Sequence, residues 1–138
     1  MPGNILLDTC AAIWITEEAK LDPTAKAALD ESAEARIPVM VSPTSAWEMG
    51  MLVARRQVSS TMSVRSWFDS LVIPPFSEMA MLTTDILINA SFLPGNPPRD
   101  PFDRLFIATA REHGYRIMTR DRKIIDYADQ GHVQVISC

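Results

Sequence analysis

Four acidic residues each lie just past a short apolar run in this chain, and they are Asp8, Glu48, Asp103 and Asp121. Three of them follow a predicted buried strand, directly or a few residues on, while Asp103 opens a predicted helix. Ligand sites in α/β folds are built outside the carboxyl ends of parallel strands, where these side chains would meet. Two carboxylates about 5–6 Å apart repel by a few kcal/mol at an effective dielectric of about 20. Because a hard divalent cation removes that repulsion, the pattern predicts a site for Mg²⁺ or Mn²⁺.

Each of these acids also has a structural interpretation at the N-terminus of a helix. Asp8 and Asp121 are placed to cap the helices that follow them. Glu48 follows Ser45 at the S-x-x-E spacing of a capping box. Asp100 is placed to cap the next helix, and the acid three residues later would favour that helix's dipole. Singly, these residues are better explained as caps, whereas four carboxylates at one end of a sheet favour a cation.

The elements that would position the acids alternate short apolar strands with helices. The predicted strands cover residues 4–7, 38–41, 72–73, 115–119 and 133–136. The predicted helices cover residues 9–15, 23–36, 45–57, 60–71, 78–90, 102–113 and 123–128. This alternation predicts an α/β fold with a mainly parallel central sheet of about five short strands, flanked by helices on both faces.

Composition limits the classes of function. The 138 residues suit one domain over residues 1–138, and a net charge of −4 argues against non-specific coating of nucleic acid. Only two histidines are present, which argues against a histidine-rich zinc site or a catalytic triad. The two cysteines, Cys10 and Cys138, lack metal-ligand spacing and are expected to be free thiols. No apolar run approaches the roughly 20 residues that cross a bilayer and no secretory signal is present, so we expect a cytoplasmic protein without a membrane segment.

Three longer phrases resemble the PIN-domain ribonucleases, specifically the VapC toxins of bacterial and archaeal toxin–antitoxin pairs. The phrases are LLDTCAAIW, SPTSAWEMGMLVARRQV and RDPFDRLFIATAREHGYRIMTRD. Each phrase alone is a weak signal, and their order and spacing over roughly residues 4–136 make the resemblance specific. The resemblance implies a single PIN domain with a PIN-like fold.

The resemblance also implies roles for individual residues. Asp8, Glu48, Asp103 and Asp121 match the four metal-site acids of the family. Asp8 and Asp103 correspond to the most direct ligands, and the other two complete the site through the metal or its waters. Thr119 matches the small hydroxyl residue often found beside the fourth acid.

Two positions depart from the pattern of the family. Many close relatives have histidine after the first Asp-Thr, where this chain has Cys10, and another shortly before the RDPFDR phrase, where it reads PGNPPRD. Neither histidine is a metal ligand in the family, so these changes bear on substrate preference and loop shape. Asp100 is the alternative to Asp103 as the third of the four metal-site acids. We prefer Asp103, because Asp-x-x-apolar leading into Ile-Ala-x-Ala is the arrangement of the family.

The implied activity is metal-assisted hydrolysis of RNA phosphodiesters. The metal would deprotonate a bound water, orient it for attack and neutralise charge on the phosphate, so no protein nucleophile is required. The candidate contacts to RNA phosphates are Arg99, Arg104, Arg120 and Arg122. The implied partners are RNA, a second copy of the chain in a homodimer, and a cognate VapB-type antitoxin whose C-terminal segment lies across the groove and blocks the acids.

Two other functions are compatible with parts of the sequence. One is a catalytically silent PIN scaffold that binds a protein partner or RNA, with the four acids serving as caps. The other is a phosphatase that uses the strand-end Asp8 as nucleophile. That chemistry usually has a second acid two residues on, where this chain has Cys10.

Overall fold

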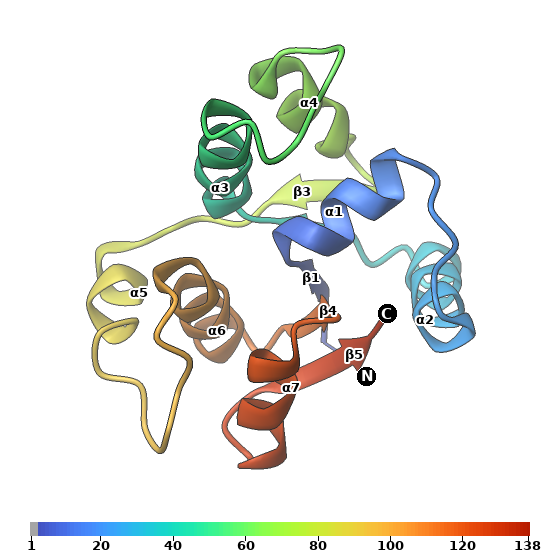
Figure 1. Cartoon of the computed structure of the whole chain (residues 1–138). Helices are drawn as coiled ribbons and strands as arrows, with labels where there is room; N and C mark the ends of the chain where they lie inside the picture. The colour runs from blue at the N-terminus through green and yellow to red at the C-terminus, as the bar shows by residue number, and fades with distance from the viewer. Residues whose placement is uncertain (1–2) are drawn as a thin grey trace.

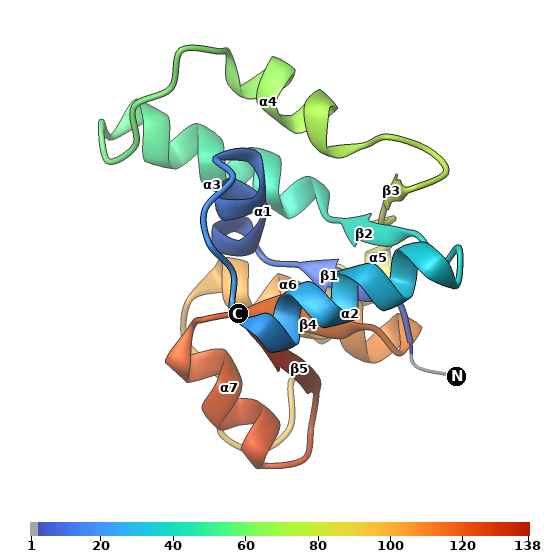
Figure 2. The ribbon, with the colours of Figure 1, turned by 90° about the vertical axis from the view of Figure 1, so that its right-hand side faces the viewer.

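Five parallel strands form one sheet in the computed structural model, which describes residues 3–138. The strands are β1 (Ile5–Leu7), β2 (Val39–Val41), β3 (Ser77–Met79), β4 (Arg116–Thr119) and β5 (Gln134–Ser137). Their order across the sheet is β3-β2-β1-β4-β5, so β1 is central and pairs with β2 and β4 (Figures 1 and 2). All four pairings are parallel, which confirms the predicted α/β fold with about five short strands.

Within the described residues, seven helices cover the two faces of this sheet. They are α1 (Thr9–Thr16), α2 (Pro23–Glu34), α3 (Pro43–Ala54), α4 (Val64–Leu71), α5 (Thr84–Asn89), α6 (Pro101–His113) and α7 (Arg122–Asp129). Ile5 and Leu7 pack in one core with α1–α4, whereas Leu6 packs in the other with α6 and α7. Figures 1 and 2 show α2 and α6 on opposite sides of the sheet. Because both faces are covered, β1 is apolar at every position.

Two helices begin and one ends where the sequence indicates. Helix α2 begins at Pro23 after the cap Asp22, and α6 begins at Pro101 after the cap Asp100. Gly114 follows the last residue of α6 with a φ of 73°, the left-handed conformation that a helix end often requires. These starts and ends depend on a few adjacent residues. They fix the length of α6, the helix that directly precedes β4.

The region between α4 and α5 differs from the prediction. Residues 72–73 are not a strand, and Ser77 begins the edge strand β3 rather than capping a helix over residues 78–90. The Ser77 hydroxyl accepts the N–H of Ile73 at 2.8 Å and donates to the carbonyl of Leu71 at 2.6 Å, so it holds a turn. Helix α5 begins only at Thr84, after the cap Thr83. The pairing of β3 with β2 decides this segment, and local propensity does not reveal that pairing.

Helix α3 begins two residues before the predicted start at Ser45. Its cap is Ser42, whose hydroxyl accepts the N–H of Thr44 at 3.0 Å, and Pro43 takes the first helical position. The capping box between Ser45 and Glu48 is therefore wrong, because both residues lie inside the helix. Glu48 is in the second turn, and its side chain is free for another role.

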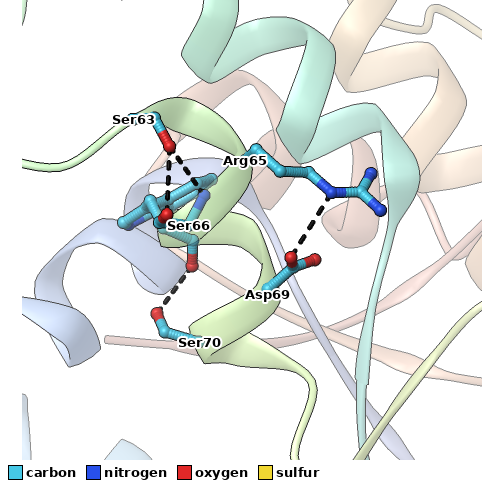
Figure 3. Close-up of polar contacts among 6 residues, drawn as sticks. Ser63, Arg65, Ser66, Asp69 and Ser70 are labelled. Carbon is cyan, nitrogen blue, oxygen red and sulfur yellow. Dashed lines mark hydrogen bonds and ion pairs between the residues drawn. The ribbon is translucent and has the colours of Figure 1, made fainter.

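Helix α4 begins at Val64 after the cap Ser63, four residues later than the predicted helix over residues 60–71. The Ser63 hydroxyl accepts the N–H of Ser66 at 3.1 Å and lies 3.0 Å from that residue's own hydroxyl (Figure 3). Trp67 donates its indole N–H to Thr16 at 3.1 Å, which ties α4 to α1. These contacts set the start of α4 and hold this helix against α1.

Candidate active site

Four acidic residues from four parts of the fold lie at the same edge of the sheet, and we call Asp8, Glu48, Asp103 and Asp121 the acid cluster. Asp8 directly follows β1, and Asp121 follows its neighbour β4 by two residues. Glu48 comes from α3, the helix after β2, and Asp103 from the first turn of α6. The cluster therefore lies at the carboxyl ends of three adjacent parallel strands, where the sequence predicts a ligand site.

Two members of the acid cluster are helix caps, as their positions in the sequence suggest. Oδ1 of Asp8 accepts the N–H of Ala11 at 2.8 Å, and Oδ1 of Asp121 accepts the N–H of Lys123 at 2.8 Å. Capping fixes both carboxylates at the edge of the sheet, so it assists a role as ligand and does not exclude one.

Two aspartates, Asp100 and Asp103, are candidates for the third metal-site acid. Asp100 caps α6 by accepting the N–H groups of Phe102 at 2.8 Å and Asp103 at 3.2 Å. Asp103 is at the third helical position, and its pKa lies well above the usual range because of burial and then the charges of Asp121, Asp100 and Glu48. The cap interpretation of Asp100 is confirmed, whereas the choice of Asp103 as ligand stays a prediction.

The acid cluster shares one electrostatic field. Asp8 is only 5% exposed, and burial is the main cause that raises its pKa to about 6, with the charge of Asp121 adding to it. Burial also raises the pKa of Glu48, with smaller contributions from the charges of Asp100, Asp8 and Asp121. Carboxyl groups whose pKa is raised by burial and by neighbouring acids are an expected signature of a cation or acid–base site.

Thr119 supports two members of the acid cluster. Its side chain is fully buried, and its Oγ1 accepts the N–H of Asp121 at 2.9 Å. It also hydrogen bonds to Asp8, which lowers the pKa of that carboxyl and so favours its ionised form. The predicted supporting role of Thr119 thus has a physical basis in the contacts it makes.

Three residues beside the acid cluster were not predicted as site residues. Thr9 and Ser45 are buried, their hydroxyl oxygens lie 3.2 Å apart, and Thr9 hydrogen bonds to the carboxylate of Glu48. Cys10 is an exposed free thiol whose pKa rises to about 12, first through partial burial and then through the charges of all four acids. The signals were present, since Thr9 and Cys10 directly follow Asp8 and Ser45 begins the S-x-x-E phrase.

The acid cluster shares a field without forming a closed coordination shell. In the part of the chain that the structure describes, no three acidic, histidine or cysteine side chains are close enough to hold a metal ion as a group. The donor set still suits a hard cation, because Mg²⁺ binds through one or two carboxylates and keeps several waters. Convergence of the whole cluster on one ion stays a prediction.

Two of the four candidate phosphate contacts are engaged in structural bonds. The guanidinium of Arg104 donates to the carbonyls of Ala90, Pro98 and Ser91 at 2.8, 2.8 and 3.3 Å. Arg120 lies 3.8 Å from the ring centroid of Trp14 and donates to the carbonyls of Cys138 and Lys20. These contacts disfavour both residues as phosphate contacts, although none of the four assignments is tested.

The other two candidates face solvent. Arg122 forms an exposed ion pair with Asp126 at 3.0 Å, one helical turn along α7. Arg99 is exposed in the loop before α6. Because exposed ion pairs of this kind are weak, the Arg122 side chain can turn toward a ligand, and the exposed Arg99 side chain can do so as well.

Solved structures with a similar fold identify the fold class of this chain. VapBC2 from Rickettsia felis bound to a DNA fragment from their promoter matches with a TM-score of 0.65 and 11% identity, over 96% of this chain and 97% of that one. FitAcB from Neisseria gonorrhoeae matches with a TM-score of 0.55 and 20% identity, over 96% of both chains. At these identities the likeness establishes a common fold, a parallel α/β domain of the PIN type.

Sequence comparison identifies the family. The PIN domain matches residues 5–130 of the chain. Ribonuclease VapC22 of Mycobacterium tuberculosis (strain ATCC 25618 / H37Rv) is 31% identical over 122 residues, which cover 88% of this chain and 89% of that one. The chain therefore belongs to the PIN-domain family, and the resemblance to VapC proteins seen in the sequence is confirmed. Among residues 3–138, no helix has the length and apolar character needed to cross a membrane.

Proposed function

We propose that this chain is a Mg²⁺- or Mn²⁺-dependent endoribonuclease that acts as the toxin of a VapBC-type toxin–antitoxin pair in the cytoplasm. The observation that carries this proposal is the acid cluster at the carboxyl edge of the sheet, where burial and the charges of neighbouring acids raise the pKa of Asp8, Glu48 and Asp103. The similarity to a protein named as a VapC ribonuclease supports the choice of RNA.

The chain's own residues have distinct parts in this mechanism. A bound divalent cation supplies a water of lowered pKa and positive charge beside the phosphate. Asp8 and Asp103 would hold that cation, and Glu48 and Asp121 would complete the site through the metal or its waters. Thr119 favours the ionised form of Asp8 and accepts a hydrogen bond from the backbone N–H of Asp121. These contacts keep the acid cluster oriented before substrate arrives.

RNA cleavage by the purified chain tests the proposal. We expect internal cleavage of RNA with Mg²⁺ or Mn²⁺, complete loss of cleavage with EDTA, and recovery when the metal is restored. Water attack leaves a 5′-phosphate and a 3′-hydroxyl, whereas attack by the RNA 2′-hydroxyl leaves a cyclic phosphate. Metal-independent cleavage with cyclic ends would contradict the mechanism, and no cleavage with either metal would favour a silent scaffold.

The proposed partners are a VapB-type antitoxin and a second copy of this chain. Support for the antitoxin comes from the VapBC2 structure, which matches over nearly the whole chain. We expect growth arrest when the chain is expressed alone and rescue when a small antitoxin encoded beside it is co-expressed. Growth arrest that is indifferent to that partner would contradict the pairing, and sedimentation of the purified chain as a monomer would contradict the homodimer.

A further inference from the structure

An aromatic pair lies beside the acid cluster where α3 meets α6. The rings of Trp47 and Phe102 pack edge to face, with centroids 4.6 Å apart and planes inclined at 69°. Trp47 directly precedes Glu48, and Phe102 directly precedes Asp103. Helices α3 and α6 contact each other here, so Glu48 and Asp103 are each the next residue in the chain after one ring of this pair.

Trp47 is the most open of the three tryptophans. It is 55% exposed, whereas Trp67 is 4% exposed and bonded to α1. Trp14 is partly buried, with the guanidinium of Arg120 over its ring. An indole that packs against Phe102 and is more than half exposed offers a rigid apolar surface at little cost in side-chain entropy.

An uncharged contact would add to the affinity of this chain for RNA. The chain carries a net charge of −4, and the acid cluster repels phosphates. The guanidinium groups of Arg104 and Arg120 are bonded to backbone carbonyls. Stacking of a base on an aromatic ring adds affinity without charge, and it requires an unpaired base with an open face.

We propose that Trp47 stacks a nucleobase of single-stranded RNA beside the acid cluster and that Phe102 braces the indole. The proposal rests on the proposed function, because it assigns a contact to the RNA substrate of that site. Trp47 thereby becomes a binding residue that places the neighbouring phosphodiester over the acids, and the acids carry out the hydrolysis.

Binding to a cleavage-deficient chain gives the first test. In an Asp8→Asn background with Mg²⁺, we use a pool of short single-stranded RNAs of randomised sequence and the same pool annealed to its complement. We expect the single strands to bind more tightly and to quench tryptophan fluorescence. Trp47→Ala should weaken their binding about 5- to 100-fold and remove most of the quenching, since stacking contributes that much per base. Trp47→Phe should retain most of the affinity.

Phe76→Ala is the matched control. Phe76 is 70% exposed and precedes β3, so it lies at the end of the sheet opposite to the acid cluster. We expect this variant to bind the RNA pool as the parent does. A second measurement uses chains with Asp8 intact, in which Trp47→Ala should raise KM about tenfold or more and leave kcat within about threefold.

The outcomes separate this proposal from the proposed function. If Asp8-intact protein cleaves RNA and Trp47→Ala leaves both affinity and KM unchanged, the stacking proposal is overturned and the nuclease assignment stands. If Trp47→Ala abolishes antitoxin binding or self-association but not RNA affinity, Trp47 is a protein contact and the proposal is also overturned. If the parent chain neither binds nor cleaves RNA, both proposals fail together.

Discussion

The Thr119 hydroxyl oxygen accepts the backbone N–H of Asp121 at 2.9 Å, and the same fully buried side chain hydrogen bonds to Asp8. One threonine at the end of β4 thus connects the acid that follows β1 with the acid that follows β4. Because β1 and β4 are neighbours in the sheet, this contact sets the relative position of two members of the acid cluster.

Replacing Thr119 tests that connection. Thr119→Val keeps the shape but removes the hydroxyl, so the N–H of Asp121 loses its acceptor in a buried site. We expect the free energy of unfolding to fall by about 1–3 kcal/mol in urea denaturation, together with slower RNA cleavage. Thr119→Ser should restore most of both. A valine variant as stable and active as the parent would show that the connection is unimportant.

The pH dependence of stability reports on Asp8. Its pKa is about 6 in the fold against a reference value of 3.8, so folding favours the protonated form. The contribution of Asp8 to stability is therefore fully present below about pH 4 and is lost as the pH rises through about 6, by up to about 3 kcal/mol. Asp8→Asn keeps the cap and removes this decline, because asparagine caps as well as aspartate.

Metal-free denaturation at two pH values measures this effect. With EDTA present, we expect Asp8→Asn to be more stable than the parent near pH 7, by up to about 3 kcal/mol, and equal to it near pH 4. The burial of Asp8 makes it the member with the least solvent screening. A difference between the two chains that is the same at both pH values would contradict the raised pKa of Asp8.

Metal binding distinguishes Asp103 from Asp100. A cation that relieves the repulsion in the acid cluster should raise the thermal midpoint, with a stabilisation of about 2.7 kcal/mol at a hundredfold excess over Kd. We expect Asp103→Asn to lose most of the rise with Mn²⁺. Asp100→Asn is the matched control, since asparagine retains the cap of α6 and should leave the rise intact. If Asp100→Asn loses the rise with Mn²⁺ and Asp103→Asn keeps it, the third metal-site acid is Asp100.

Arg104 and Arg99 should respond differently to substitution. Arg104→Lys loses the fork that reaches three carbonyls, so we expect a loss of about 2–3 kcal/mol in the free energy of unfolding. Arg99→Ala should change stability by less than about 0.5 kcal/mol, yet reduce the salt dependence of RNA binding by about one phosphate contact. Equal stability of both variants would contradict the structural role of Arg104.

Local sequence signals predicted those elements whose ends are set by adjacent residues. The Asp-Pro pairs at Asp22 and Asp100 mark helix starts, and Gly114 marks the end of α6, because cap chemistry needs only neighbours in the chain. The edge strand β3 could not be found in this way. Its three residues are partly buried or exposed and lack an apolar run, so only their pairing with β2 makes them a strand.

The candidate site shows the same division. The positions of Asp8 and Asp121 follow from the strands before them, whereas the orientation of Glu48 depends on where α3 begins. The Ser45–Glu48 spacing fits a capping box and a mid-helix pair equally well, and Ser42-Pro43 decides between them. The raised pKa values of Asp8 and Asp103 depend on burial between elements far apart in the chain, which no short phrase encodes.

The central claim is that the acid cluster carries metal-dependent RNA hydrolysis, and a matched pair of cap variants tests it most directly. Asp8 and Asp22 each cap a helix by accepting one backbone N–H at 2.8 Å, but Asp22 is exposed and outside the acid cluster. RNA cleavage with Mn²⁺ is measured for Asp8→Asn and Asp22→Asn. We predict that Asp8→Asn loses cleavage by a factor of about 100 or more while remaining folded, and that Asp22→Asn cleaves as the parent does. Cleavage that persists in Asp8→Asn at the parent's rate would contradict the account.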